Sequence, residues 1–370
     1  MGEDVAVGDR SHAASRSDSG MGVRGVLVPV LVGLVLLIVG GYATWQLVGV
    51  DSITLGGARA AVEEPASTRA PASRTAETIR VGLYPEGVAV DRRSGRVFVV
   101  NREDPDPDFA GGSVSVIDTE SREVVETVEV GVEPTGVAVD EESRRVFVAN
   151  SADGTLSVLD ADSLDEVDTV EIGQEPRGVA LGPDGTLVYV ADTEAATVSV
   201  LDVESLFVVD EIGVGWRPVA VAAEETDGLV LVSNSEAGSV EVIDPTQPQQ
   251  AFDVGERPFG LAVDHSAGAV YVANWGSDSV WVVEARTRRW WDTITVGSRP
   301  FGVAMDPAAR AAYVSNWADG TVSVIDTRSR DVVRTVPVGL RPTGVAVDTS
   351  TGDVYVANWR DGTVSVLEVS

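Results

Sequence analysis

Arginine supplies all of the basic side chains of this chain apart from two histidines, and this limits the chemistry that the chain can perform. The 27 Lys and Arg positions are all Arg, and there is no Cys. A lysine Schiff base, a thiol nucleophile, a disulfide and a thiolate metal site are therefore excluded. The two histidines are His12 and His265. We identify no catalytic constellation and expect no cofactor.

Arginine, tryptophan and phenylalanine recur together in the last third of the chain. Each of three arginines precedes a proline, at a spacing of 42 residues, and the tryptophans follow with the same spacing. Guanidinium groups bind carboxylate or phosphate, and indole rings stack on sugars or anchor peptides. The candidate ligand-binding residues are Arg257, Arg299, Arg341, Trp275, Trp317, Trp359, Phe259 and Phe301.

A second interpretation of these residues is purely structural. It assigns the tryptophans to packing between neighbouring repeats and pairs the arginines with acidic side chains. Residues 76–370 contain 51 acidic residues against 21 arginines, a net charge of −30, so carboxylates are plentiful. The sequence leaves both interpretations open. The same charge argues against nucleic acid as a partner, because phosphate binding needs a basic surface.

Three aspartates alternate with other residues in one acidic segment. Asp104, Asp106 and Asp108 have the spacing that begins a calcium-binding loop. Phe109 stands where such a loop has Gly, and no Glu follows at the twelfth position. The segment is a weak metal candidate, and a solvated acidic loop or an acidic lid that pairs with Arg341 are the alternatives.

Prolines mark seven copies of one repeat, which must position these side chains. They are Pro85, Pro134, Pro176, Pro218, Pro258, Pro300 and Pro342, spaced by 49, 42, 42, 40, 42 and 42 residues. The repeat unit contains four short strand-like segments with tight turns such as Asp319-Gly320. Such a period predicts an all-β, seven-bladed propeller of four-stranded blades over residues 76–370. The loops with the candidate arginines and tryptophans then open on one face, the top face.

The two ends of the repeat region predict how the ring closes. The seventh copy ends at Ser370 after its third strand, and a matching fourth-strand segment, residues 78–82, precedes the first copy. We therefore expect the N-terminal strand to complete the last blade, which removes an exposed sheet edge.

The repeats resemble those of the YVTN family of β-propeller proteins. The resemblance covers residues 76–370 and rests on VYVANW, VSVID and VGxxPxGVAVD as they stand here. It implies a propeller of the surface-layer or extracytoplasmic type found in prokaryotes, and it says almost nothing about the ligand.

The N-terminal part has a different composition. Residues 25–50 form an uncharged apolar run that is long enough to cross a bilayer as a helix. We predict a cytoplasmic tail over residues 1–24, a single transmembrane anchor over 25–50, a disordered stalk over 51–75 and a propeller outside the cytoplasm. The alternative is a cleaved signal peptide and a secreted protein.

These observations favour a binding protein over an enzyme. We expect a membrane-anchored extracytoplasmic platform that binds a protein, a peptide or a cell-envelope glycan on its top face. The alternatives are a metal-dependent, lactonase-like hydrolase or lyase and a surface-coat spacer without a specific ligand. The oligomeric state does not follow from the sequence.

Overall fold

The computed structural model describes residues 38–39, 42–43, 74–103 and 111–368. The chain divides into two compact units, residues 1–67 and 68–370. In the first, β1 (Ile38–Val39) pairs with β2 (Tyr42–Ala43) in antiparallel register. The rest of the predicted anchor, the tail and most of the stalk lie outside the described residues. No helix long and apolar enough to cross a membrane occurs among the residues described.

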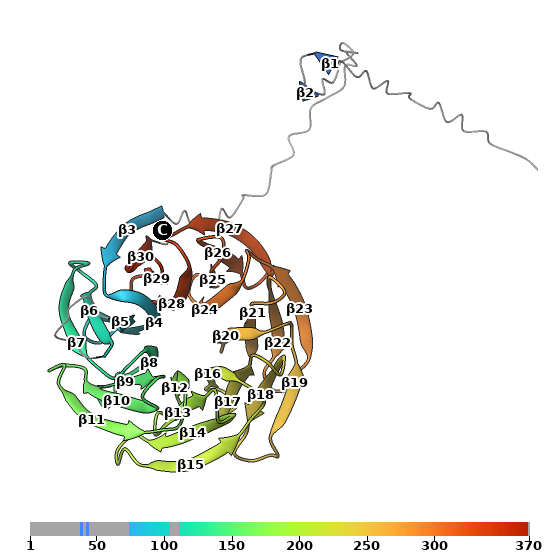
Figure 1. Ribbon diagram of the computed structural model, residues 1–370. Helices are drawn as coiled ribbons and strands as arrows, with labels where there is room; N and C mark the ends of the chain where they lie inside the picture. The colour runs from blue at the N-terminus through green and yellow to red at the C-terminus, as the bar shows by residue number, and fades with distance from the viewer. Residues whose placement is uncertain (1–37, 40–41, 44–73, 104–110, 369–370) are drawn as a thin grey trace, which may run out of the picture. The chain divides into compact units, whose positions relative to one another are not determined.

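The second unit is a seven-bladed β-propeller with four-stranded blades, as predicted (Figure 1). The inner strands are β4 (Leu83–Asp91), β8 (Pro134–Asp140), β12 (Pro176–Leu181), β16 (Pro218–Glu224), β20 (Pro258–Asp264), β24 (Pro300–Asp306) and β28 (Pro342–Val347). The second strands are β5 (Arg96–Glu103), β9 (Arg145–Asn150), β13 (Leu187–Asp192), β17 (Leu229–Asn234), β21 (Ala269–Asn274), β25 (Ala311–Asn316) and β29 (Val354–Asn358). The third strands are β6 (Ser113–Asp118), β10 (Thr155–Asp160), β14 (Thr197–Asp202), β18 (Ser239–Ile243), β22 (Ser279–Glu284), β26 (Thr321–Asp326) and β30 (Thr363–Glu368). The outer strands are β7 (Val124–Glu129), β11 (Glu166–Glu171), β15 (Val208–Gly213), β19 (Gln250–Asp253), β23 (Trp290–Thr295), β27 (Asp331–Pro337) and β3 (Arg74–Arg80). Numbered from the N-terminal side, blade 1 is β4–β7 and blade 7 is β28, β29, β30 and β3.

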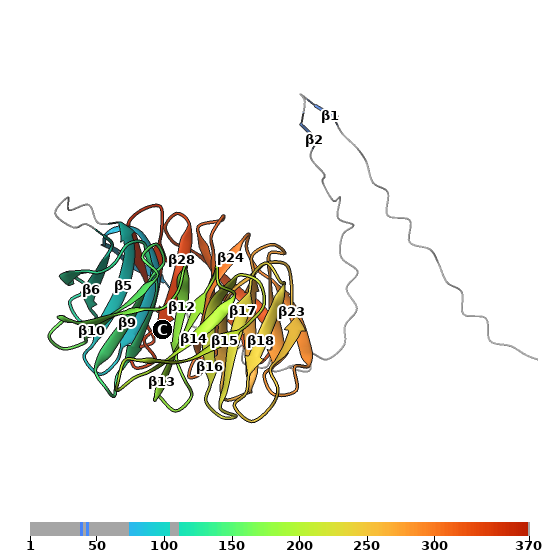
Figure 2. The same cartoon turned by 60° about the horizontal axis from the view of Figure 1, so that its bottom comes forward.

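The strands of the blades run between two opposite faces, so the connecting loops gather on those faces (Figure 2). Side chains of the second and third strands fill the space between blades. Their alternating small and β-branched residues suit a pleated surface that is covered on both sides. Tyr271, Tyr313 and Tyr355 are fully buried at equivalent positions of blades 5, 6 and 7. Burial raises the pKa of Tyr271 to about 12.

Glycine near the start of the inner strands lets neighbouring blades approach closely around the channel. A Cβ on Gly136 would lie 1.9 Å from the carbonyl oxygen of Arg177 in the next blade. A Cβ on Gly344 would lie 2.3 Å from the carbonyl oxygen of Glu86, which joins blade 7 to blade 1 in the same way. Real Cβ atoms do not approach backbone so closely, and glycine is therefore required at both positions.

A buried asparagine fixes the top loop of blade 6. Asn316 is fully buried, and its side-chain Nδ2 donates to Thr321 Oγ1 at 3.0 Å and to Ser323 Oγ at 2.9 Å. The backbone N–H of Gly320 donates to the Asn316 carbonyl, which closes the turn. Gly320 has φ +66°, the left-handed region that glycine adopts without strain. Trp317 directly follows this asparagine and is therefore held at a fixed place on the top face.

The outer strand of blade 7 is the N-terminal strand β3. It pairs with β30 in antiparallel register, with Ile79 opposite Val364 and Arg80 opposite Thr363, and Figure 1 shows the two strands side by side. Ile79 is only 6% exposed. The strand begins at Arg74, two residues before the predicted propeller boundary.

Candidate functional site

The same backbone hydrogen bond places arginine beside tryptophan in blades 5, 6 and 7. The N–H of Trp317 donates to the carbonyl of Arg299 at 3.0 Å, and Trp275 and Trp359 bond to Arg257 and Arg341 at 3.0 and 3.1 Å. The loop before each inner strand therefore touches the loop after the second strand of the same blade. All three arginines have φ between +49° and +56°. This left-handed backbone conformation is energetically unfavourable for residues other than glycine.

The aromatic side chains of neighbouring blades form one cluster. The ring centroid of Phe259 lies 5.3 Å from that of Trp275 and 5.0 Å from that of Phe301. Trp275 lies 5.1 Å from Trp317 and 6.1 Å from Phe301. These four rings are half-buried. Part of the structural interpretation therefore holds, because the rings do pack against each other between blades.

Two arginines lie between successive tryptophans. The Cζ atom of Arg299 is 5.6 Å from the ring centroids of both Trp275 and Trp317. Arg341 Cζ is 4.5 Å from Trp317 and 5.4 Å from Trp359. All four distances are within the range of a cation–π interaction. The predicted residues of blades 5 to 7 thus form a continuous row rather than separate sites.

Arg257 stands at the end of this row. Arg299 and Arg341 each lie next to the tryptophan of the preceding blade, but blade 4, which precedes Arg257, has Ser235 at that position. Among the described residues, no stacking contact brings Arg257 onto a ring. Arg257 is exposed to solvent. Of the three predicted arginines, Arg257 is the one whose guanidinium makes no cation–π contact with the described rings.

Tyr84 extends the row at its other end and was not among the predicted residues. Its ring centroid lies 4.6 Å from that of Trp359, across the junction of blade 7 with blade 1. The available signal was its place directly before Pro85, which corresponds to the position of the three arginines. We use the term Arg–Trp sector for the eight predicted residues together with Tyr84.

Two arginines elsewhere on the top face, Arg102 and Arg217, are paired with carboxylates. Arg217 stands before Pro218, as Arg299 stands before Pro300, and its guanidinium lies 2.7 Å from Glu194, 3.5 Å from Glu236 and 3.8 Å from Glu175. Arg102 pairs with Glu86 and Glu133. Burial opposes the charge of Arg102, yet these two carboxylates raise its pKa above the usual value.

The arginines of the Arg–Trp sector differ in this respect. Within the part of the chain that the structure describes, no carboxylate lies within ion-pairing distance of Arg257, Arg299 or Arg341. Among the described residues, the interpretation that pairs arginines with acids therefore applies to Arg102 and Arg217 and not to the arginines of the sector. Within the described ranges, these three exposed positive charges have no carboxylate partner, although the domain is strongly acidic.

The central channel adjoins the sector but is narrow. A cavity of about 120 Å³ lies near the top of the channel, with Phe259 and Phe301 on one side and Glu86, Thr135 and Arg177 among its other lining residues. Pockets for small-molecule ligands usually enclose about 300–1,000 Å³. The cavity admits a few waters or one small side chain.

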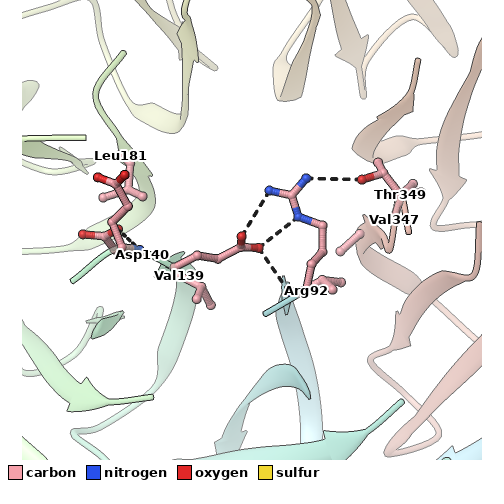
Figure 3. Close-up of a pocket in the computed structure, with 10 residues that line it drawn as sticks. Arg92, Val139, Asp140, Leu181, Val347 and Thr349 are labelled. Carbon is pink, nitrogen blue, oxygen red and sulfur yellow. Dashed lines mark hydrogen bonds and ion pairs between the residues drawn. The ribbon is translucent and has the colours of Figure 1, made fainter. Parts of the chain in front are cut away.

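The opposite mouth of the channel is wider, and its arginine is paired. A cavity of about 360 Å³ is lined by aliphatic side chains such as Val139, Leu181 and Val347 (Figure 3). Arg92 extends across it, and its guanidinium donates to Glu141 Oε1 at 2.9 Å and to Thr349 Oγ1 at 3.3 Å. Arg92 thus links blades 1, 2 and 7, and its charge is paired with Glu141 within the propeller.

Acidic residues at the ends of the inner strands bind their own turns. Asp306, for example, accepts the N–H groups of Ala308 at 2.9 Å and Ala309 at 3.0 Å. His265 is a loop residue, 3.8 Å from Glu224. The described residues contain no group of three or more His, Asp or Glu arranged to hold a metal ion. Asp104, Asp106 and Asp108 lie outside the described residues.

Comparison with known proteins supports the fold and leaves the function open. A model of the NHL repeat matches residues 340–367, which lie in blade 7. Hydrazine synthase of Kuenenia stuttgartiensis has a similar structure, with a TM-score of 0.68 and 19% identity over 78% of this chain and 96% of that chain. A streptogramin B lyase structure gives a TM-score of 0.67 and 13% identity over 80% and 97%. No curated protein sequence matches the chain. At these identities the similarity shows the fold alone, and propellers carry many unrelated functions.

Proposed function

We propose that this chain is a membrane-anchored, extracytoplasmic propeller of the YVTN type, and that its Arg–Trp sector binds an acidic partner without catalysing a reaction. The anchor rests on the length and apolarity of residues 25–50. Its orientation rests on Arg10, Arg16 and Arg24, which precede the apolar run. The assignment to the YVTN type rests on the repeat motifs VYVANW, VSVID and VGxxPxGVAVD.

One observation carries the binding function. The sector holds three exposed arginines without a described carboxylate partner, whereas Arg217, at the same repeat position, has three. Arginine and tryptophan are also the residue types that contribute most to binding at protein interfaces. An acidic partner would supply the missing carboxylates.

The geometry also explains how an acidic partner could bind a protein of net charge −31. At physiological ionic strength the Debye length is about 8 Å, so acids elsewhere on the ring are largely screened. Arg341 stacks on indole faces, which leaves the in-plane N–H donors of a guanidinium available to a carboxylate. The neighbouring rings exclude water and strengthen the charge interaction.

Polyglutamate titrated onto the full chain in detergent tests this proposal. We expect Arg299→Ala to weaken binding about tenfold, since a charged hydrogen bond contributes about 1.5–3 kcal/mol. Arg217→Ala is the matched control, because it removes the same side chain from the same backbone conformation in a blade where the arginine is already paired. Equal effects of the two substitutions, or no binding of polyglutamate at all, would contradict the proposal.

A further inference from the structure

A groove opens on the top face between blades 6 and 7. It encloses about 410 Å³, and its walls include Trp317, Leu340, Arg341 and Arg360. Leu340 is 60% exposed, and both arginines are exposed. The N–H of Arg360 donates to the Leu340 carbonyl at 3.2 Å, which holds these two loops together.

The equivalent place between blades 3 and 4 shows how a carboxylate fits this geometry. There Arg217, which corresponds to Arg341, lies 2.7 Å from Glu194 and 3.5 Å from Glu236. In the repeat these glutamates occupy the positions of Ala318 and Arg360. One carboxylate is thus absent from the groove between blades 6 and 7, and a second arginine replaces the other.

Two acids, Asp319 in the groove and Asp361 next to Arg360, already accept backbone hydrogen bonds. Asp319 lines the groove, and its carboxylate accepts the backbone N–H of Ser298 at 2.7 Å. The Asp361 carboxylate accepts the N–H of Leu340 at the same distance. Neither lies within ion-pairing distance of Arg341 or Arg360 in the described part of the chain. Two guanidinium groups beside an exposed leucine therefore have no acidic partner among the described residues.

We propose that this groove binds an acidic segment of a partner protein, with two carboxylates at the guanidinium groups and an aliphatic side chain against Leu340. The proposal rests on the proposed function and narrows it to one groove and one ligand chemistry. One carboxylate of the segment would take the place that Glu194 holds between blades 3 and 4, and the other would pair with Arg360, which stands at the repeat position of Glu236. An acidic polysaccharide offers carboxylates but no aliphatic side chain for Leu340, and a protein segment is therefore the better match.

The test uses a capped hexapeptide of alternating Glu and Leu, titrated onto the full chain in detergent. The decisive variant is Ala318→Glu, which supplies the carboxylate that blade 3 provides through Glu194. This variant leaves every arginine and tryptophan in place. We expect it to weaken peptide binding at least tenfold without changing the melting temperature. Ala152→Glu is the matched control, since it adds the same charge at the same exposed repeat position in blade 2, and we expect it to have little effect.

The outcomes separate this inference from the proposed function. If the peptide binds, and Arg299→Ala weakens its binding while Ala318→Glu does not, the assignment of the binding site to this groove is wrong and the sector remains the binding surface. If a hexapeptide of Gln and Leu, or a polyuronate, binds as tightly as the Glu–Leu peptide, the proposed ligand chemistry is wrong. If neither the peptide nor polyglutamate binds, both proposals fail.

Discussion

Removal of residues 74–80 is expected to destabilise the propeller by about 5 kcal/mol or more and to make it aggregate. The deletion removes β3, exposes the edge of β30 and takes away the buried side chain of Ile79. Losing a buried Ile side chain alone costs about 2–5 kcal/mol, and an unpaired edge strand templates association. Calorimetry and light scattering would measure the result, a fall in the melting temperature of roughly 10 °C.

This experiment decides how the ring closes. Blades 7 and 1 also meet through their inner strands, at Gly344 and Glu86. If those contacts are sufficient, the deletion leaves a monomer with an unchanged melting curve, and closure by the N-terminal strand is wrong. The control is a deletion of equal length in the predicted stalk, residues 60–66, which we expect to leave the melting curve unchanged.

The second large effect is expected from Trp317→Ser. Trp317 stacks against Arg299 and Arg341 and packs on Trp275, so it lies at the centre of the Arg–Trp sector. Its removal should weaken binding of an acidic ligand by about 30-fold, equivalent to about 2 kcal/mol, which is typical of a central interface tryptophan. The propeller should remain folded, because the equivalent residues of blades 2 and 4 are Ser151 and Ser235.

Trp216→Ser is the matched control for this prediction. Trp216 is 70% exposed in the loop before blade 4 and lies outside the sector. We expect its loss to change neither affinity nor stability. If Trp317→Ser instead melts the domain while the affinity stays the same, the tryptophans serve only to pack the blades.

The blades could be predicted from the sequence because residues within each repeat indicate where its strands begin and turn. The framework prolines begin the inner strands of blades 2 to 7, and in blade 6 Asp319-Gly320 lies in the turn between β25 and β26, as predicted. Proline fixes φ and glycine allows positive φ. The glycine of this turn recurs in blades 2, 4 and 7, whereas Ala196 and Asp278 take the same positive-φ position in blades 3 and 5. Most of the N-terminal predictions concern residues outside those described, and the anchor remains a proposal.

Whether a top-face arginine pairs with a carboxylate or stacks on tryptophan depends on residues of the neighbouring blade. The pattern within one repeat does not show these residues. Arg217 and Arg341 occupy the same repeat position, yet one is paired with carboxylates and the other stacks on tryptophan. The difference comes from Glu194 and Glu236, whose places are taken by Ala318 and Arg360. Comparing these neighbouring positions across the repeats would have separated the two kinds of arginine. Tyr84 was missed because its partner, Trp359, is in the last blade while Tyr84 is in the first.

The most direct measurement of the central claim is the NMR signal of each indole N–H during titration with polyglutamate. The chain has eight tryptophans, which single Trp→Phe variants would assign. If the Arg–Trp sector binds acidic partners, the signals of Trp275, Trp317 and Trp359 shift together and saturate at one affinity. Trp290 and Trp291, which lie on the outer strand β23 of blade 5, should stay unchanged. Shifts confined to Trp290, Trp291 or Trp216, with the three sector signals unmoved, would contradict the claim.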